Sequence, residues 1–144
     1  MLVHQILKDK PEGGVVTVRS DQTVSDVVDL LSARKFGAVI VSDDTKVPLG
    51  IVSERDIVRE IGRNGIGVLD KTVADIMTRD LVVCSREENA VDVLQTMTNG
   101  RFRHMPVMNG NEMIGLISIG DVVKGRLSEL AMEKDALEGM IMGH

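Results

Sequence analysis

The chain has 144 residues, of which 43% are hydrophobic and only two, Phe36 and Phe102, are aromatic. This length suits one domain or two very small ones, with a core built from Val, Ile, Leu and Met side chains. The net charge of −5 argues against nucleic acid as a partner, because phosphate backbones are bound by concentrated Lys and Arg.

The N-terminal segment 1–14 lacks the long apolar run of a signal peptide or a transmembrane helix. Cys84 is the only cysteine, so an internal disulfide is excluded. These features predict a cytoplasmic protein that has no membrane contact. Cys84 ends an apolar run, which favours a buried structural thiol over a nucleophile or a redox sensor.

The first part of the chain predicts a strand, a helix, two strands joined by a polar turn, and a second helix. The strand covers 15–18, and apolar residues at helical spacing follow it from Val24 to Leu31. Residues 36–41 read as the next strand, and the turn 42–48 is rich in Asp and contains Pro. The order is β-α-β-β-α.

The second part of the chain repeats this order 66 residues later. Residues 81–84 match 15–18, the helix face from Ala90 to Met97 matches the first helix face, and 102–107 match 36–41. Upstream, a short apolar lead-in also occurs twice, from Val3 to Leu7 and from Val73 to Met77, at an offset of 70, with the four extra residues placed near 11–14. The chain is therefore a tandem duplication of the α/β class, of α+β type.

The boundaries follow from the duplication. The first unit covers 1–62, a glycine-rich flexible linker covers 63–71, and the second unit covers 72–130. The tail 131–144 is expected to continue the last helix to about Leu137.

One phrase occurs in both units. It reads GIVSERDIV from Gly50 and GLISIGDVV from Gly115. Ser53 and Ser118 fall where a strand ends and a helix begins, and Asp56 and Asp121 follow three residues later. This spacing is typical of a helix capping box. A helix N-terminus also offers N–H groups to an anion, and a carboxylate there can accept two ribose hydroxyls, so a binding role stays open.

Two β-α-β-β-α units that each end in this phrase resemble the CBS domain family. The resemblance covers roughly residues 3–130, and it implies two units packed as a pseudo-twofold pair (a Bateman module) with adenosyl ligands such as AMP, ATP or S-adenosylmethionine between them. It implies that Asp56 and Asp121 bind ribose hydroxyls, and that Ser53 and Ser118 lie on the phosphate side or at the helix end.

Other candidates for a nucleotide site lie on the second unit's lead-in and central strand. Aliphatic side chains would hold the adenine, although core packing explains them as well: Ile76, Met77, Thr78, Met105 and Pro106. Some nucleotide-binding relatives place basic residues before a similar run, so we assign a phosphate role to at least one of Arg103 and His104. Arg55 and Arg59 could add positive charge, or could simply lie on an exposed helix face.

The first unit has Gly37 and Ala38 where the second has Arg103 and His104. We therefore expect unequal occupancy, with the tighter nucleotide site on the second unit's side. No metal site and no required cofactor are predicted.

The leading functional hypothesis is a regulatory adenine-nucleotide sensor that acts on an unknown partner and is not an enzyme. One alternative is a structural or adaptor module without ligand, and another is a module that binds NAD(H) or S-adenosylmethionine. A weak enzyme or a redox-linked regulator working through Cys84 is a further alternative. A homodimer is also expected, formed through the faces Val24–Leu31 and Ala90–Met97 and through apolar residues of the last helix: Ile119, Val122, Val123, Leu127 and Leu130.

Overall fold

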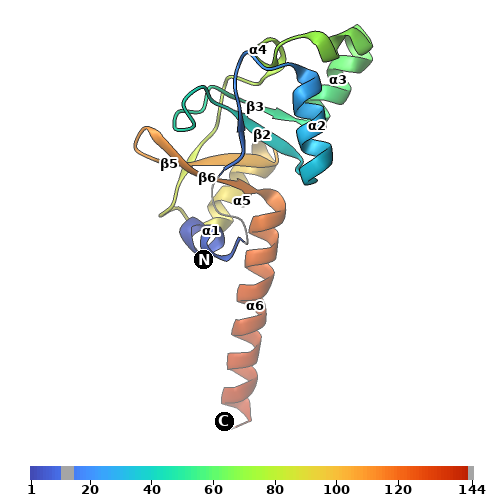
Figure 1. Ribbon diagram of the computed structural model, residues 1–144. Coiled ribbons are helices and arrows are strands. Elements are labelled where there is room, and N and C mark those ends of the chain that lie inside the picture. Colours follow the sequence, from blue (N-terminus) through green and yellow to red (C-terminus); the bar gives the residue numbers. More distant parts are fainter. Residues whose placement is uncertain (11–14, 143–144) are drawn as a thin grey trace. The chain divides into compact units, whose positions relative to one another are not determined.

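The computed structural model describes residues 1–10 and 15–142 (Figure 1). The chain forms short strands and longer helices in the order α1 (Val3–Asp9), β1 (Thr17–Val18), α2 (Val24–Arg34), β2 (Ala38–Val41), β3 (Gly50–Ser53), α3 (Glu54–Asn64), a 3-10 helix η1 (Ile66–Asp70), α4 (Val73–Ile76), β4 (Cys84–Ser85), α5 (Ala90–Gly100), β5 (His104–Asn109), β6 (Glu112–Ser118) and α6 (Ile119–Ile141). The predicted β-α-β-β-α order is confirmed in both repeats. The four residues that the sequence places as extra at 11–14 lie outside the described residues, as do 143–144.

The strands form two small sheets of three strands each, in the orders β1-β2-β3 and β4-β5-β6. In the first sheet, β1 runs parallel to β2, with Val18 beside Val41, and β2 runs antiparallel to β3, with Val39 beside Val52. All four residues of β2 are buried. A central strand that is apolar throughout fits a sheet covered on both faces.

The described residues divide into two compact units that do not follow the sequence repeat. The α1 unit contains 1–10, 83–107 and 115–142, and the α4 unit contains 15–82 and 108–114. Each unit therefore combines the body of one repeat with the lead-in of the other. The repeat boundaries 1–62 and 72–130 describe the sequence duplication, and the compact units are discontinuous in sequence.

Backbone hydrogen bonds attach each lead-in to the body of the other repeat. In the α4 unit, Val73 N donates to Gln22 O at 2.8 Å, and Thr23 forms an isolated bridge with Thr72. The α1 unit repeats this contact, since Val3 N donates to Glu88 O at 2.9 Å. Val73 and Val3 differ by the lead-in offset of 70, and Gln22 and Glu88 differ by the body offset of 66.

Two glycines leave room for the lead-ins. A Cβ on Gly50 would lie 2.6 Å from Met77 Sδ and 2.9 Å from Thr78 O. A Cβ on Gly115 would lie 2.8 Å from Leu7 Cδ2. The structure gives the reason for both glycines, which is the close approach of a lead-in side chain.

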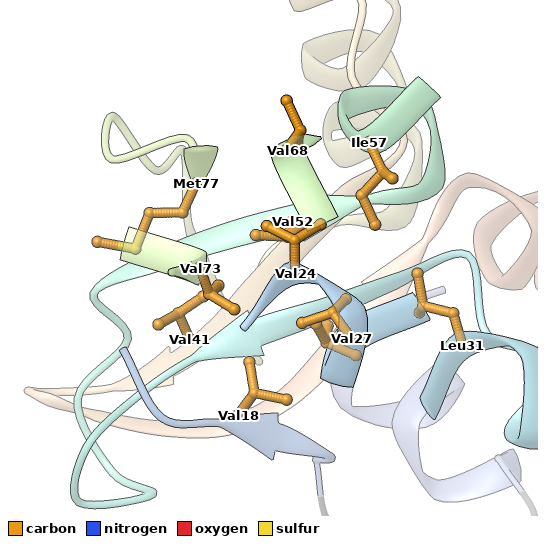
Figure 2. Close-up of a cluster of buried hydrophobic side chains, with 11 residues drawn as sticks. Val18, Val24, Val27, Leu31, Val41, Val52, Ile57, Val68, Val73 and Met77 are labelled. Atoms are coloured by element: carbon orange, nitrogen blue, oxygen red, sulfur yellow. The ribbon is translucent and has the colours of Figure 1, made fainter. Parts of the chain in front are cut away.

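The core of the α4 unit lies between its sheet and its helices. Figure 2 shows side chains of α2, η1 and α4 gathered over the sheet residues Val41 and Val52. Val68 of η1 is only 1% exposed and belongs to this core. The segment 63–71 therefore differs from the flexible linker that its glycines predict, because burial of Val68 holds η1 against the unit.

The core of the α1 unit is equally aliphatic. Its buried members come from α1, β4, α5, β5, β6 and α6: Val3, Ile6, Cys84, Ala90, Val93, Met97, Met105, Val107, Ile117 and Val122. Ala90, Val93 and Met97 of α5 belong to this core, and Val24, Val27 and Leu31 of α2 belong to the other core. These are the helix faces from which the sequence predicts a dimer. Those faces of α2 and α5 are buried within their own units, so that part of the interface prediction is wrong.

The last helix is longer than predicted. The sequence places its end near Leu137, whereas α6 continues without interruption to Ile141. Residues 131–141 are therefore the outer half of α6 rather than a separate segment.

The two glycines give the first testable prediction. We expect Gly50→Ala to destabilise the protein by about 1–3 kcal/mol, because the new Cβ would contact a backbone oxygen that cannot move independently. Gly115→Ala should cost less, since the new Cβ meets only flexible atoms of Leu7. Gly62→Ala is the control, because nothing lies within 4 Å of its Cβ and alanine favours a helix by about 0.5–1 kcal/mol. Urea unfolding would measure all three, and equal losses at Gly50 and Gly115 would contradict the argument.

Candidate functional site

The N-terminus of α3 carries the first copy of the repeated phrase. Ser53 Oγ accepts a hydrogen bond from Asp56 N at 3.2 Å, and Ser53 N donates to Asp56 Oδ2 at 2.8 Å. Arg59, one turn further along the helix, donates to Asp56 Oδ1 at 2.8 Å. The predicted capping box is therefore confirmed, and the buried carboxylate is balanced by a cation from its own helix.

The N-terminus of α6 carries the second copy, with the same capping geometry. Ser118 Oγ accepts from Asp121 N at 3.1 Å, and Ser118 N donates to Asp121 Oδ2 at 2.9 Å. The cation differs, because Lys10 Nζ donates to Asp121 Oδ2 at 2.9 Å and to Leu116 O at 2.9 Å. Lys10 follows α1, so the carboxylate on α6 is tied to the lead-in of the α1 unit.

The environment of Asp121 affects its pKa in two directions. Partial burial is the largest single effect and raises the pKa of Asp121, but the hydrogen bonds from Lys10 and Ser118 and the charge of Lys10 together lower it by more. The net effect holds the pKa of Asp121 below its ordinary value. The carboxylate is therefore ionised at neutral pH and can accept hydrogen bonds from hydroxyl groups.

The residue that precedes β2 or β5 accepts a backbone hydrogen bond from the first residue of the helix that carries each site. Glu54 N donates to Gly37 O at 3.0 Å, and Ile119 N donates to Arg103 O at 2.8 Å. Arg103 is exposed and lies beside the first turn of α6. The α6 site therefore has the backbone of an arginine beside its first turn, whereas the α3 site has a glycine in the matching position.

The twelve candidate residues fall into two groups of six. The α4 unit holds Ser53, Arg55, Asp56, Ile76, Met77 and Thr78, and the α1 unit holds Arg103, His104, Met105, Pro106, Ser118 and Asp121. Arg55 is exposed on α3, and the half-buried His104 begins β5. Each unit thus contains one capped carboxylate together with candidates from a strand or a lead-in.

The apolar candidates mainly fill the cores. Met77 and Met105 are 9% and 1% exposed, and Pro106 is also buried. Ile76 is half-buried and Thr78 is exposed, and the backbone of Thr78 pairs with Ile51 of β3 through bonds of 2.9 and 3.0 Å. Core packing, which the sequence analysis weighed against a ligand role, is confirmed for both methionines and for the proline.

Cys84 is a buried thiol, as its apolar surroundings in the sequence predict. It is 4% exposed, and its Sγ lies 3.8 Å from Pro106 O. Burial, with a smaller contribution from the negative charge of Glu88, raises the pKa of Cys84 to about 12. A thiol in this environment is almost entirely protonated at neutral pH and makes a poor nucleophile.

Lys10 is the site residue that the sequence analysis missed. It lies next to the extra residues at 11–14 and matches nothing in the repeated phrase. Its only sequence signal is its place three residues after Leu7, the lead-in residue that packs at Gly115. Once the lead-in is placed on β6, a side chain that long reaches the first turn of α6.

The chain belongs to the CBS domain family, which matches residues 7–63 and 73–128. It is 32% identical to the CBS domain-containing protein CBSX3, mitochondrial, of Arabidopsis thaliana, over 98% of this chain and 72% of that protein. The crystal structure of the CBS-domain containing protein ATU1752 from Agrobacterium tumefaciens is 40% identical, with a TM-score of 0.83 over 88% of this chain and 99% of that one. The chain is thus a tandem CBS pair with an α+β fold.

A more distant solved structure shares the fold. The CBS domain pair of protein MJ0100, in complex with 5-methylthioadenosine and S-adenosyl-L-methionine, is 22% identical, with a TM-score of 0.77 over 90% of this chain and 98% of that one. In the present structure, no helix within residues 1–10 and 15–142 has the length and apolar character needed to cross a bilayer.

The ion pair at Asp121 gives a prediction on titration. Lys10→Met should raise the pKa of the Asp121 carboxyl, which carbon NMR can follow directly. Because the folded pKa is depressed, the carboxylate stabilises the fold above its unfolded pKa, near 3.9, and this stabilisation is lost as the pH falls through the folded pKa. The variant should therefore lose less stability than the parent on acidification. Lys8→Met, on an exposed position of α1, should leave the pKa of Asp121 unchanged, and an equal shift would contradict the assignment.

The buried thiol gives a prediction on reactivity. With a pKa of about 12, on the order of one Cys84 side chain in a hundred thousand is a thiolate at neutral pH. We expect a thiol reagent to label the folded protein far more slowly than the urea-unfolded protein, as measured by mass spectrometry. Labelling at the same rate in both states would revive the redox hypothesis.

Proposed function

We propose that this CBS pair is a regulatory module that binds an adenine nucleotide, with AMP, ADP or ATP as the first candidates, and that it acts on a partner protein. The observation that carries this proposal is the duplicated helix N-terminus with a capped carboxylate, Asp56 or Asp121, in its first turn. Such a carboxylate can accept two ribose hydroxyls while the helix N–H groups attract phosphate. MJ0100 supports the choice of ligand only as an example of the fold holding adenosyl compounds.

We further propose that the two sites are unequal and that the site on α6 binds more tightly. Asp121 has a side chain that is 24% exposed, compared with 12% for Asp56, so its carboxylate is more accessible. Arg103 lies beside the α6 site, where the α3 site has Gly37. A guanidinium binds phosphate through charge-assisted hydrogen bonds, so an anionic ligand gains more at Asp121.

Two other functions are outcomes of the same test. NAD(H) and S-adenosylmethionine carry the same adenosine group, and a structural or adaptor module would bind none of these compounds. We expect no turnover and no required cofactor. The cytoplasm is the proposed location, and the mitochondrial name of the Arabidopsis relative makes organelle import the alternative.

A thermal-shift panel would test the ligand class. A ligand that binds only the folded state stabilises it by about 2.7 kcal/mol at one hundred times its dissociation constant, which is plainly measurable. The panel should include AMP, ADP, ATP, NAD(H) and S-adenosylmethionine, with guanosine and inorganic phosphate as controls. Stabilisation by adenine nucleotides alone supports the proposal, and no stabilisation by any adenosine compound rejects it.

Replacement of each carboxylate would test the order of the sites. Asp121→Asn keeps an oxygen that can accept from Ser118 N, so the cap survives while the charge is lost. Loss of a charged hydrogen-bond acceptor costs about 1.5–3 kcal/mol, which corresponds to roughly 10- to 150-fold in affinity. We expect isothermal titration to show this loss at the tightest AMP site for Asp121→Asn and a much smaller loss for Asp56→Asn.

Matched alanine variants complete this experiment. Asp121→Ala should weaken AMP binding at least as much as Asp121→Asn, but it should also lower stability, because it removes the carboxylate that accepts hydrogen bonds from Lys10 and from the Ser118 N–H. If Asp56→Asn abolishes tight binding while Asp121→Asn leaves it intact, the principal site lies on α3 and the proposed order is wrong.

A further inference from the structure

The outer half of α6 has no partner within the described chain. The inner half packs in the α1 unit, where Val122 is fully buried and a Cβ on Gly125 would lie 3.1 Å from Ile6. From Leu130 onward, the large apolar side chains of α6 are all at least 44% exposed. In Figure 1, this part of α6 extends beyond α1 and α5 of the same unit. An isolated helix of about 12 residues is marginal in water, so the outer half needs a covering surface.

The exposed side chains of α6 follow a heptad pattern. They recur at alternating steps of four and three, at Val123, Leu127, Leu130, Lys134, Leu137 and Ile141. Five of these six positions are apolar, and their exposure ranges from 42% at Val123 to 76% at Ile141. An average spacing of 3.5 residues is typical of a coiled-coil seam, whereas a helix that packs on a globular core shows a broader stripe. This seam is on a different helix face from Val122 and Gly125.

We propose that this seam pairs with the same seam of a second copy of the chain, as an antiparallel two-stranded coiled coil centred near Met132. In this register, Leu127 faces Leu137 of the other copy, and Leu130 faces Lys134. The proposal concerns assembly alone and does not depend on nucleotide binding. We expect a homodimer from the sequence, and the seam assigns it a surface and a direction.

The charges beside the seam favour the antiparallel direction. Lys124 and Glu138 flank the seam on the same side, and the antiparallel register places each Lys124 beside Glu138 of the other copy. Among the residues that the structure describes, Lys124 forms no ion pair of its own. A pair of opposite charges at each end of the seam satisfies both copies equally, as a twofold axis requires.

The parallel direction places like charges together. In a parallel in-register pair, Lys134 would face Lys134 across the seam, and Glu133 would flank Glu138 of the other copy. The antiparallel register instead places the Lys134 stem against Leu130, where its ammonium can reach solvent. The antiparallel register leaves one like-charge pair, between the two Glu133 side chains, compared with two Glu133–Glu138 pairs and the facing Lys134 side chains in the parallel register. Charge therefore favours the antiparallel direction, while the apolar residues of the seam provide the attraction.

A charge exchange would test the pairing. Lys124→Glu and Glu138→Lys should each weaken the dimer, because each creates two like-charge pairs, and the double variant should restore it. We expect the dissociation constant from sedimentation equilibrium to rise about 5- to 30-fold in each single variant and to return to within about twofold in the double. Additive losses in the double variant would overturn the register. Lys134→Ala controls for the 3.9 Å contact that Glu138 makes with Lys134 in its own helix.

Single cysteines would test the direction. In the antiparallel register, Ala131 lies beside Ala131 of the other copy, whereas the two Leu137 side chains are about 15 Å apart along the helix axis. Ala131→Cys should therefore cross-link with a short bismaleimide, and Leu137→Cys should not. The reverse result would establish a parallel pair and overturn the proposal. The parent chain, whose only thiol is the buried Cys84, is the control.

Disruption of the seam would test the surface itself. Leu130→Glu with Leu137→Glu should give a monomer that keeps its core, because both side chains are exposed within the chain. Light scattering would measure the mass, and the near-native thermal transition of the variant would show that it still folds. A parent chain that is monomeric at about 100 µM, or a dimer that survives both substitutions, would reject the proposal.

Discussion

The side chains of Met77 and Leu7 occupy the space where a Cβ would project from Gly50 and Gly115. This contact seats the lead-in of each repeat on the last strand of the other repeat's sheet. In the α4 unit, it is accompanied by the paired backbone hydrogen bonds of Thr78 and Ile51. The repeats therefore cannot be folded independently of one another without leaving an apolar lead-in exposed and a sheet uncovered. The two compact units follow from this exchange.

The same contact places the candidate sites. Each of these glycines lies on the strand that leads directly into a helix, three residues before the capping serine. The strand carries its serine to the helix N-terminus, and the capping box then fixes the carboxylate in the first turn. The lead-in that passes over the glycine consequently runs close to this turn, which is how Lys10 reaches Asp121. The packing of a lead-in against Gly50 or Gly115 therefore determines both the fold of the unit and the position of its candidate site.

Local features of this protein could be predicted from the sequence, and long-range pairing could not. The helix from Val24 and the capping pair Ser53 and Asp56 depend on residues within a few positions of each other, so periodicity and spacing are sufficient. The apolar residues of each lead-in predict that it is buried. They do not indicate which of the two similar sheets it packs against. The bond between Lys10 and Asp121 depends on that choice, so the sequence analysis had no means to find it.

Composition also misled in one place. The three glycines at 62, 65 and 67 predict a flexible segment, and one valine beside them does not change this prediction from sequence. In the structure, Val68 contributes its whole side chain to the α4 core and holds η1 in place. One fully buried aliphatic side chain contributes about 1.5–3 kcal/mol, which exceeds the helix preference lost at one glycine.

The two sites differ most in where their balancing cation originates. Arg59 lies on the same helix as Asp56, so this ion pair does not connect the carboxylate to any other segment of the chain. Lys10 comes from the lead-in, and its ammonium also binds the Leu116 carbonyl on β6. A ribose hydroxyl at Asp121 would share the carboxylate with Lys10 and would alter the attachment of the lead-in to the α1 unit. Since α1 packs against the inner part of α6, a ligand that displaced Lys10 would also affect the packing of the helix that carries the exposed heptad seam. The first repeat has no such connection, because its cation is local.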